Sequence, residues 1–231
     1  IAAGFLFLIK HSITYKTDMM TAARRVVPWL VAAMALVFSV YLMQKGLKQL
    51  IKVSLMHALV VGLVSAIVVF VFVRWRFKQP HNQLLEGKQG VNSLFTVPLI
   101  FAAALLSFAH GSNDVANAIG PLAAIVDVYT AHPGQFGASA AIPLWVMCIG
   151  ALGIAIGLAL FGPKVIRTIG TEITELDQMR AYCIAMAATI TVIIASQLGL
   201  PVSSTHIAVG GVFGVLLNVG KVAQIVFALF V

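Results

Sequence analysis

The chain has 231 residues, of which 61% are hydrophobic and 10% are charged, and its mean hydropathy is +1.02. Ordinary soluble domains are about 45–50% apolar and about 25% charged, so this composition excludes them and indicates an integral membrane protein. The net charge of +8 comes from Lys and Arg residues between apolar runs, where they orient helices, so no nucleic-acid partner is expected. The apolar runs are continuous rather than alternating, which predicts an all-α, polytopic architecture.

Three apolar segments lie in the first 92 residues. Residues 1–9 are expected to be the end of a helix, whereas 26–43 and 53–73 are about as long as the roughly 20 residues that cross a bilayer core. The chain begins without Met inside an apolar run and stops inside another. We therefore expect a fragment of a longer protein, in which residues 222–231 form a truncated last helix.

From residue 93 onward, two apolar segments are interrupted. Residues 93–126 are expected to form a broken helix, and 142–161 a further span. Residues 181–220 contain no Asp, Glu, Lys or Arg and are interrupted by Gly, Pro and Ser, which leaves two arms of roughly 15–18 residues. Irregular backbone at membrane depth is tolerated only inside protein or beside a cavity, so we predict a re-entrant helical hairpin over 181–220.

Positive charge predicts the orientation of these helices. Segments 10–25, 74–92 and 163–180 carry most of the Lys and Arg residues, whereas the opposite side holds only Lys45, Lys48 and Lys52. Cytoplasmic loops carry an excess of Lys and Arg, so the three basic segments are expected to be cytoplasmic. The chain is then a multi-pass protein of the cell membrane, with the lipid bilayer as a partner.

The first polar segment, residues 108–121, interrupts an otherwise apolar stretch with His110, Ser112, Asn113, Asp114 and Asn117. An ionisable group at membrane depth costs from a few to more than about ten kcal/mol, so it suggests a functional site. Gly111 and Ser112 are expected to interrupt the helix. One residue of Ser112, Asn113 and Asp114 would then cap a restarted helix.

Spacing brings three of these side chains together. Asn113 and Asn117 are four apart and share one helical face, and Asp114 and Asn117 are three apart and can converge. Carboxylate and amide oxygens suit a hard monovalent cation, while one imidazole without a thiolate does not make a transition-metal site. The segment therefore predicts a cation site. The alternative is a polar contact between helices.

The second polar segment, residues 199–206, offers three hydroxyls, from Ser203, Ser204 and Thr205, at the start of a helical arm after Pro201. Backbone N–H groups and the positive end of the helix dipole make such a terminus an anion site. The alternative is that the hydroxyls only cap the arm.

Lys and Arg are absent from the sequence between Lys88 and Lys164 and from residues 181–220. An anion bound by the two polar segments must therefore be balanced by helix termini, hydroxyl donors and co-bound cations. Transporters with discontinuous helices use this arrangement. The residues thus favour cation-coupled anion transport.

His110 and His206 each border one polar segment, and each could exchange protons or donate a single hydrogen bond to a carbonyl. An intramembrane serine hydrolase that uses Ser203 or Ser204 with His206 is a remote alternative. Residues two or three apart at a helix start rarely give the geometry of a nucleophile and its base, so we do not expect an enzyme.

Residues 111–118 read Gly-Ser-Asn-Asp-Val-Ala-Asn-Ala, and residues 201–206 read Pro-Val-Ser-Ser-Thr-His. The chain here resembles the inorganic phosphate transporter (Pit) family. The first stretch is similar to its GANDVANA-type signature, with Ser112 in place of the usual Ala, and the second to its PVS-S/T-TH hairpin motif. Two long motifs at a family-like separation are far more specific than either alone.

The resemblance implies an inverted-repeat architecture in which each motif occurs twice, whereas each occurs here once. Residues 1–92 would be trailing transmembrane helices of the first repeat plus a basic linker. Residues 93–231 would be the second repeat, and the N-terminal repeat of the same chain would be its missing partner. A homodimer is left open.

The resemblance also implies secondary active transport of inorganic phosphate, with Na⁺ or H⁺ as coupling ion, by alternating access around a midplane site and with no tightly bound cofactor. By carry-over, phosphate would contact Asn113, Ser203, Ser204 and Thr205. Asp114 and Asn117 would lie nearer the coupling cation. The alternative is a transporter or channel for another oxyanion such as sulfate.

Overall fold

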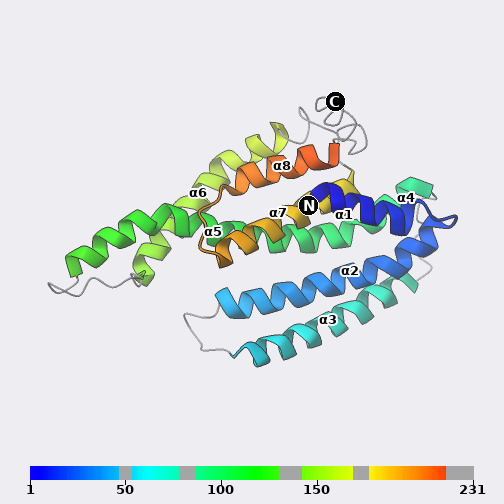
Figure 1. Cartoon of the computed structure of the whole chain (residues 1–231), viewed down its shortest axis with the longest axis horizontal. Coiled ribbons are helices and arrows are strands. Elements are labelled where there is room, and N and C mark those ends of the chain that lie inside the picture. Colours follow the sequence, from blue (N-terminus) through cyan, green and yellow to red (C-terminus); the bar gives the residue numbers. More distant parts are fainter. Residues whose placement is uncertain (47–53, 79–86, 131–141, 169–176, 217–231) are drawn as a thin grey trace, which may run out of the picture. The chain divides into compact units, whose positions relative to one another are not determined.

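The structure, a computed structural model (Figure 1), describes residues 1–46, 54–78, 87–130, 142–168 and 177–216. The elements in these ranges are all helices, including two short π-helical turns, η1 and η2. In chain order they are α1 (Ala2–Ile9), η1 (Lys10–Thr14), α2 (Met19–Tyr41), η2 (Leu42–Gly46), α3 (Leu55–Lys78), α4 (Gly87–Leu94), α5 (Thr96–Thr130), α6 (Leu144–Thr168), α7 (Gln178–Gln197) and α8 (Ser204–Leu216). The predicted truncated helix over 222–231 lies outside the described residues.

Five helical segments of the described chain are long and apolar enough to cross a membrane. They are Met19–Gln44, Leu55–Phe77, Gly87–Tyr129, Leu144–Lys164 and Gln178–Gln197. The all-α, multi-pass architecture predicted from the continuous apolar runs is therefore confirmed.

The helix that follows the first basic segment begins earlier than predicted. Asp18 caps α2, because its carboxylate accepts the N–H of Thr21 at 3.0 Å. Hydrogen bonding from the Thr21 side chain and then from its backbone N–H lowers the pKa of Asp18. The basic segment 10–25, which lies between two predicted apolar helices, is consequently mostly helical, as η1 and the start of α2. Pro28 then lies buried inside α2.

The predicted break and restart at Gly111 and Ser112 are wrong. The chain turns at Phe95, between α4 and α5, and α5 then continues as one helix through the whole first polar segment to Thr130. A bilayer offers no water to satisfy a freed backbone group, so continuing the helix is favoured over breaking it. Asn113 and Asp114 cap nothing, because their side chains bond to another segment, as described below.

The hairpin predicted over 181–220 is formed by α7 and α8, which residues 198–203 join. Gly211 of α8 lies against α7, where an added Cβ would be 3.1 Å from Ile184 Cγ2. α7 has 20 residues, so the first arm is longer than predicted and could cross a membrane by length and composition. The re-entrant path of the hairpin stays a prediction.

The chain divides into two compact units. The first unit contains Ile1–Leu106, Asp177–Thr189 and residues from Ala208 onward, and the second contains Ser107–Leu176 and Ile190–Ile207. Helices α5, α7 and α8 each contribute residues to both units.

In the first unit, α2 and α3 pack side by side (Figure 1). Gly62 allows the close approach, since a Cβ there would be 2.7 Å from Val40 Cγ2. Ser39 Oγ and Ser65 Oγ are 2.8 Å apart, and Ser65 Oγ also donates to the Gly62 carbonyl at 2.8 Å. Small residues and neutral hydroxyl pairs are the usual means by which membrane helices associate.

Candidate functional site

The turn between α7 and α8 has a local explanation in its residues. Gly199 has a φ of +68°, which favours glycine, and Leu200 N–H donates to the Ala195 carbonyl at 2.9 Å, so α7 ends in a Schellman-type cap. Pro201 follows, where a helix cannot continue. Ser203 then caps α8, because its Oγ accepts the N–H of His206 at 3.3 Å.

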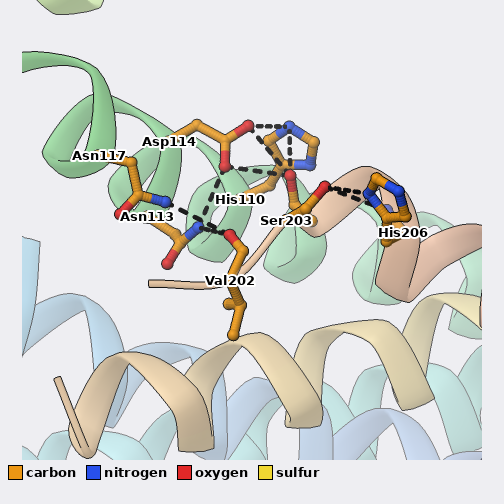
Figure 2. Close-up of polar contacts among 8 residues, drawn as sticks. His110, Asn113, Asp114, Asn117, Val202, Ser203 and His206 are labelled. Atoms are coloured by element: carbon orange, nitrogen blue, oxygen red, sulfur yellow. Dashed lines mark hydrogen bonds and ion pairs between the residues drawn. The ribbon is translucent and has the colours of Figure 1, made fainter. Parts of the chain in front are cut away.

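Within the second unit, the carboxamides of α5 bind this turn (Figure 2). Asn113 Nδ2 donates to the Val202 carbonyl at 3.0 Å, and Asn117 Nδ2 donates to the same carbonyl at 3.3 Å. The two side chains therefore share one face of α5, as their four-residue spacing predicted. The first and second polar segments are in direct contact.

Asp114 receives three donors. Ser204 Oγ lies 3.0 Å from each of its carboxylate oxygens, His110 Nε2 lies 2.8 Å from Oδ2, and Asn113 Nδ2 lies 3.1 Å from Oδ1. A carboxylate only accepts, so the His110 ring donates through Nε2. Ser204 is also the first residue of α8, which places the negative charge at the positive end of a helix dipole.

The contacts above form a polar centre, which consists of His110, Asn113, Asp114, Asn117, Ser204 and the Val202 carbonyl. The burial of its side chains is uneven. Asn113 and Ser204 are 6% and 4% exposed, whereas the side chains of Asp114 and His110 are 31% and 43% exposed. In the part of the chain that the structure describes, His110 is the ion-pair partner of Asp114, and neither Lys nor Arg pairs with it. Hydrogen-bond donors and a helix terminus, without Lys or Arg, thus stabilise the carboxylate while one side of it stays accessible.

The three hydroxyls of the second polar segment do not converge. Ser204 Oγ donates to Asp114. Ser203 Oγ instead lies 2.7 Å from Nδ1 of His206, and both of these residues are exposed. Figure 2 shows the Ser203–His206 pair. Thr205 is exposed and takes part in none of these contacts, and Ser112 is exposed as well. The Ser203–His206 pair closes the cap of α8, so its short distance has a structural explanation without a nucleophile.

Two groups in or next to this centre escaped the sequence interpretation. One is the Val202 carbonyl, since a backbone oxygen carries no residue-type signal. The other is Ser196, in the last turn of α7, whose Oγ donates to Asn113 Oδ1 at 3.3 Å. Its only sequence signal is a polar residue at the end of an apolar arm, directly before the turn.

The arrangement offers oxygens for a hard cation and donors for an anion. Asn117 donates through Nδ2, so its Oδ1 remains as an acceptor, whereas α8 presents its N-terminal hydroxyls and N–H groups. Among the described residues, no group of three His, Cys, Asp or Glu side chains could hold a metal ion.

Comparison with known proteins agrees with the motif resemblance. The family model described as "Phosphate transporter family" matches residues 1–230. A "Putative phosphate permease" of Helicobacter pylori J99 is 56% identical over 216 residues, which cover 93% of this chain and 40% of that relative. A protein of the same description from Haemophilus influenzae is 33% identical over 222 residues, which cover 93% of this chain and 52% of the relative.

One solved structure, "The sodium-dependent phosphate transporter", matches with a TM-score of 0.79 and 29% identity, covering all of this chain and 58% of that one. The chain therefore spans about half the length of the proteins it matches. The family match over nearly every residue, together with the two motifs meeting in one polar centre, shows that the chain belongs to the Phosphate transporter family.

Proposed function

We propose that the complete protein containing this chain is a secondary transporter that moves inorganic phosphate together with Na⁺ by alternating access. One observation carries the proposal: Ser204, the first residue of α8, donates to the Asp114 carboxylate of α5. A group suited to an anion and a group suited to a cation thus share one hydrogen bond. The Na⁺ assignment is supported by the solved relative, which is a sodium-dependent transporter.

The shared hydrogen bond suggests how the two substrates are coupled. Ser204 has a single hydroxyl hydrogen, which can serve Asp114 or a bound oxyanion, but not both at full strength. A phosphate that accepts this hydrogen removes a donor from the Asp114 carboxylate, and a bound cation then stabilises the charge of the carboxylate. Each substrate should therefore raise the affinity of the other by the same factor, as binding linkage requires.

Residue roles are carried over from the family motifs, and the hydrogen bonds among Asn113, Asp114 and Ser204 support the roles of these three residues. Phosphate is assigned to Asn113, Ser203, Ser204 and Thr205, and the cation to Asp114 and Asn117. His110 holds the carboxylate through a hydrogen bond, and His206 holds the α8 cap. The division into trailing first-repeat helices over 1–92 and a second repeat over 93–231 belongs to the same proposal.

The test is uptake of radiolabelled phosphate into proteoliposomes that contain the complete protein. An inward Na⁺ gradient should drive uptake, replacement of Na⁺ by choline should remove it at both mildly acidic and mildly alkaline pH, and excess sulfate should not compete. Uptake that persists in choline would contradict Na⁺ coupling. Equal competition by sulfate would replace phosphate with a broader oxyanion substrate.

Membrane orientation is a separate part of the proposal, in which the basic segments 10–25, 74–92 and 163–180 are cytoplasmic. A membrane-impermeant thiol reagent added outside cells should label Lys48→Cys and leave Lys16→Cys unlabelled. The opposite labelling pattern would reverse the orientation.

A further inference from the structure

We infer that Ser196 is a positioning residue, which holds the carboxamide of Asn113 with its NH₂ group turned toward Asp114 and the Val202 carbonyl. The inference rests on the proposed function, because it assigns Ser196 a part in phosphate affinity. Ser196 lies in the last turn of α7, outside both polar segments defined by the sequence.

The hydrogen bonds fix which way the amide points. Ser196 Oγ donates to Asn113 Oδ1 at 3.3 Å, while Asn113 Nδ2 donates to the Val202 carbonyl at 3.0 Å and to Asp114 Oδ1 at 3.1 Å. The two ends of a carboxamide have nearly the same shape, so their partners alone distinguish them. Here two acceptors face the nitrogen and one hydroxyl donor faces the oxygen.

Burial makes the Ser196 donor hard to replace. Asn113 is 6% exposed, so water has little access to an oxygen that loses its partner. An unsatisfied buried acceptor is costly, whereas the hydrogen bond itself contributes modestly. Without Ser196, Oδ1 loses this donor and only the two acceptors at Nδ2 hold the amide, so its orientation is fixed less firmly.

The position of Ser196 is in turn set by the turn that follows it. Its carbonyl accepts the N–H of Gly199 at 3.4 Å, in the cap that ends α7. The backbone of Ser196 thus belongs to the α7–α8 turn, while its side chain reaches α5. This links the orientation of the Asn113 amide to the folding of the turn.

The orientation decides what Asn113 can offer a ligand. An NH₂ group turned into the centre donates, so a bound oxyanion can accept the hydrogen that Asp114 Oδ1 accepts in this structure. The flipped amide would place its oxygen against the Asp114 carboxylate and the Val202 carbonyl, which are both acceptors. Together with these two acceptors, Ser196 therefore keeps the Asn113 NH₂ group turned into the centre, where it favours phosphate affinity over cation coordination.

The experiment compares phosphate uptake kinetics of the complete protein with those of Ser196→Ala, Ser196→Thr and Thr189→Ala. Ser196→Ala should raise the KM for phosphate about tenfold, as expected for loss of one buried hydrogen bond, while the maximal rate changes less than about twofold. Ser196→Thr keeps the hydroxyl and should restore the wild-type KM. Thr189→Ala is the matched control, because Thr189 is a buried α7 hydroxyl that bonds the Ala185 carbonyl of its own helix.

A double-mutant cycle with Asn113→Ala separates positioning from general packing. If Ser196 acts through Asn113, then Ser196→Ala should add nothing in the Asn113→Ala background. Phosphate binding to the purified protein by calorimetry supplies the same cycle if uptake by Asn113→Ala is too slow to follow. The inference would be overturned if Ser196→Ala raised the KM by the same factor in the Asn113→Ala background as in the wild type. It would also be overturned if Ser196→Ala raised the KM no more than Thr189→Ala does.

Failure of the inference and failure of the proposed function are distinct outcomes. Wild-type protein that does not take up phosphate contradicts the proposed function before any variant is made. Wild-type uptake combined with an unchanged KM in Ser196→Ala contradicts only the role of Ser196.

Discussion

The α2–α3 pair and the polar centre on α5 both place hydroxyl groups inside membrane-type helices, but they use them differently. Between α2 and α3, Ser39 and Ser65 bond each other and a backbone carbonyl, so the neutral contact is complete in itself. In the polar centre, the hydroxyl of Ser204 serves a carboxylate that remains 31% exposed.

The difference shows what distinguishes a site from a packing contact. A polar residue in an apolar helix is by itself compatible with either, since small and hydroxyl side chains commonly join membrane helices. An ionisable group supported by a donor from a segment about 90 residues away is not needed for packing.

The largest difference is expected from deleting one hydroxyl in each region. Ser204→Ala should lower phosphate affinity on the order of tenfold to a hundredfold, because a hydrogen bond to a charged group is lost. Ser65→Ala should leave phosphate uptake unchanged, since that hydroxyl serves α2–α3 packing. Uptake kinetics of the complete protein check both. Equal losses of phosphate affinity in the two variants would contradict the distinction between a binding site at Ser204 and a packing contact at Ser65.

A smaller effect should come from crowding the α2–α3 contact. Gly62→Ala should destabilise the protein by about 1–3 kcal/mol, because the new Cβ would meet Val40 Cγ2 at 2.7 Å. Gly153→Ala in α6 is the control, since nothing lies within 4 Å of its added Cβ. Thermal unfolding in detergent should lower the Tm of the first variant only. A Tm loss in Gly153→Ala of the same size would show that the close approach is not the cause.

The smallest effect concerns the cap of α2. The hydrogen bond from Thr21 lowers the pKa of Asp18, so the carboxylate stabilises the folded state above the ordinary Asp pKa of about 3.9. This contribution is lost as the pH falls through the lower folded-state pKa. Asp18→Asn keeps an acceptor but does not titrate, so its Tm should depend less on pH in this acidic range. An unchanged pH dependence would exclude Asp18 as its source.

The helical spans could be predicted because continuous apolar runs in a bilayer have few other solutions. The continuity of α5 could not, because Gly111 and Ser112 are helix breakers only where water or a cap can satisfy the freed backbone. The early start of α2 depends on Asp18, whose capping role becomes visible only with its bond to Thr21.

Most members of the polar centre were predictable, but their pairing was not. Residue type and spacing select Asn113, Asp114 and Asn117, yet their partners lie more than 80 residues away. The turn hydroxyls were expected to act together. Instead, Ser203 accepts a hydrogen bond in the α8 cap, and Ser204 donates to the Asp114 carboxylate of α5. Such divisions depend on three-dimensional placement, which spacing along one helix does not determine.

The most direct test of the central claim is Na⁺-driven phosphate uptake by Asp114→Asn in the complete protein. Loss of the charge should lower Na⁺-dependent uptake on the order of a hundredfold, because the cation loses its charged ligand. Asp18→Asn, which removes one negative charge from an exposed helix cap, should transport as wild type does. Wild-type, Na⁺-stimulated uptake in Asp114→Asn would contradict the account.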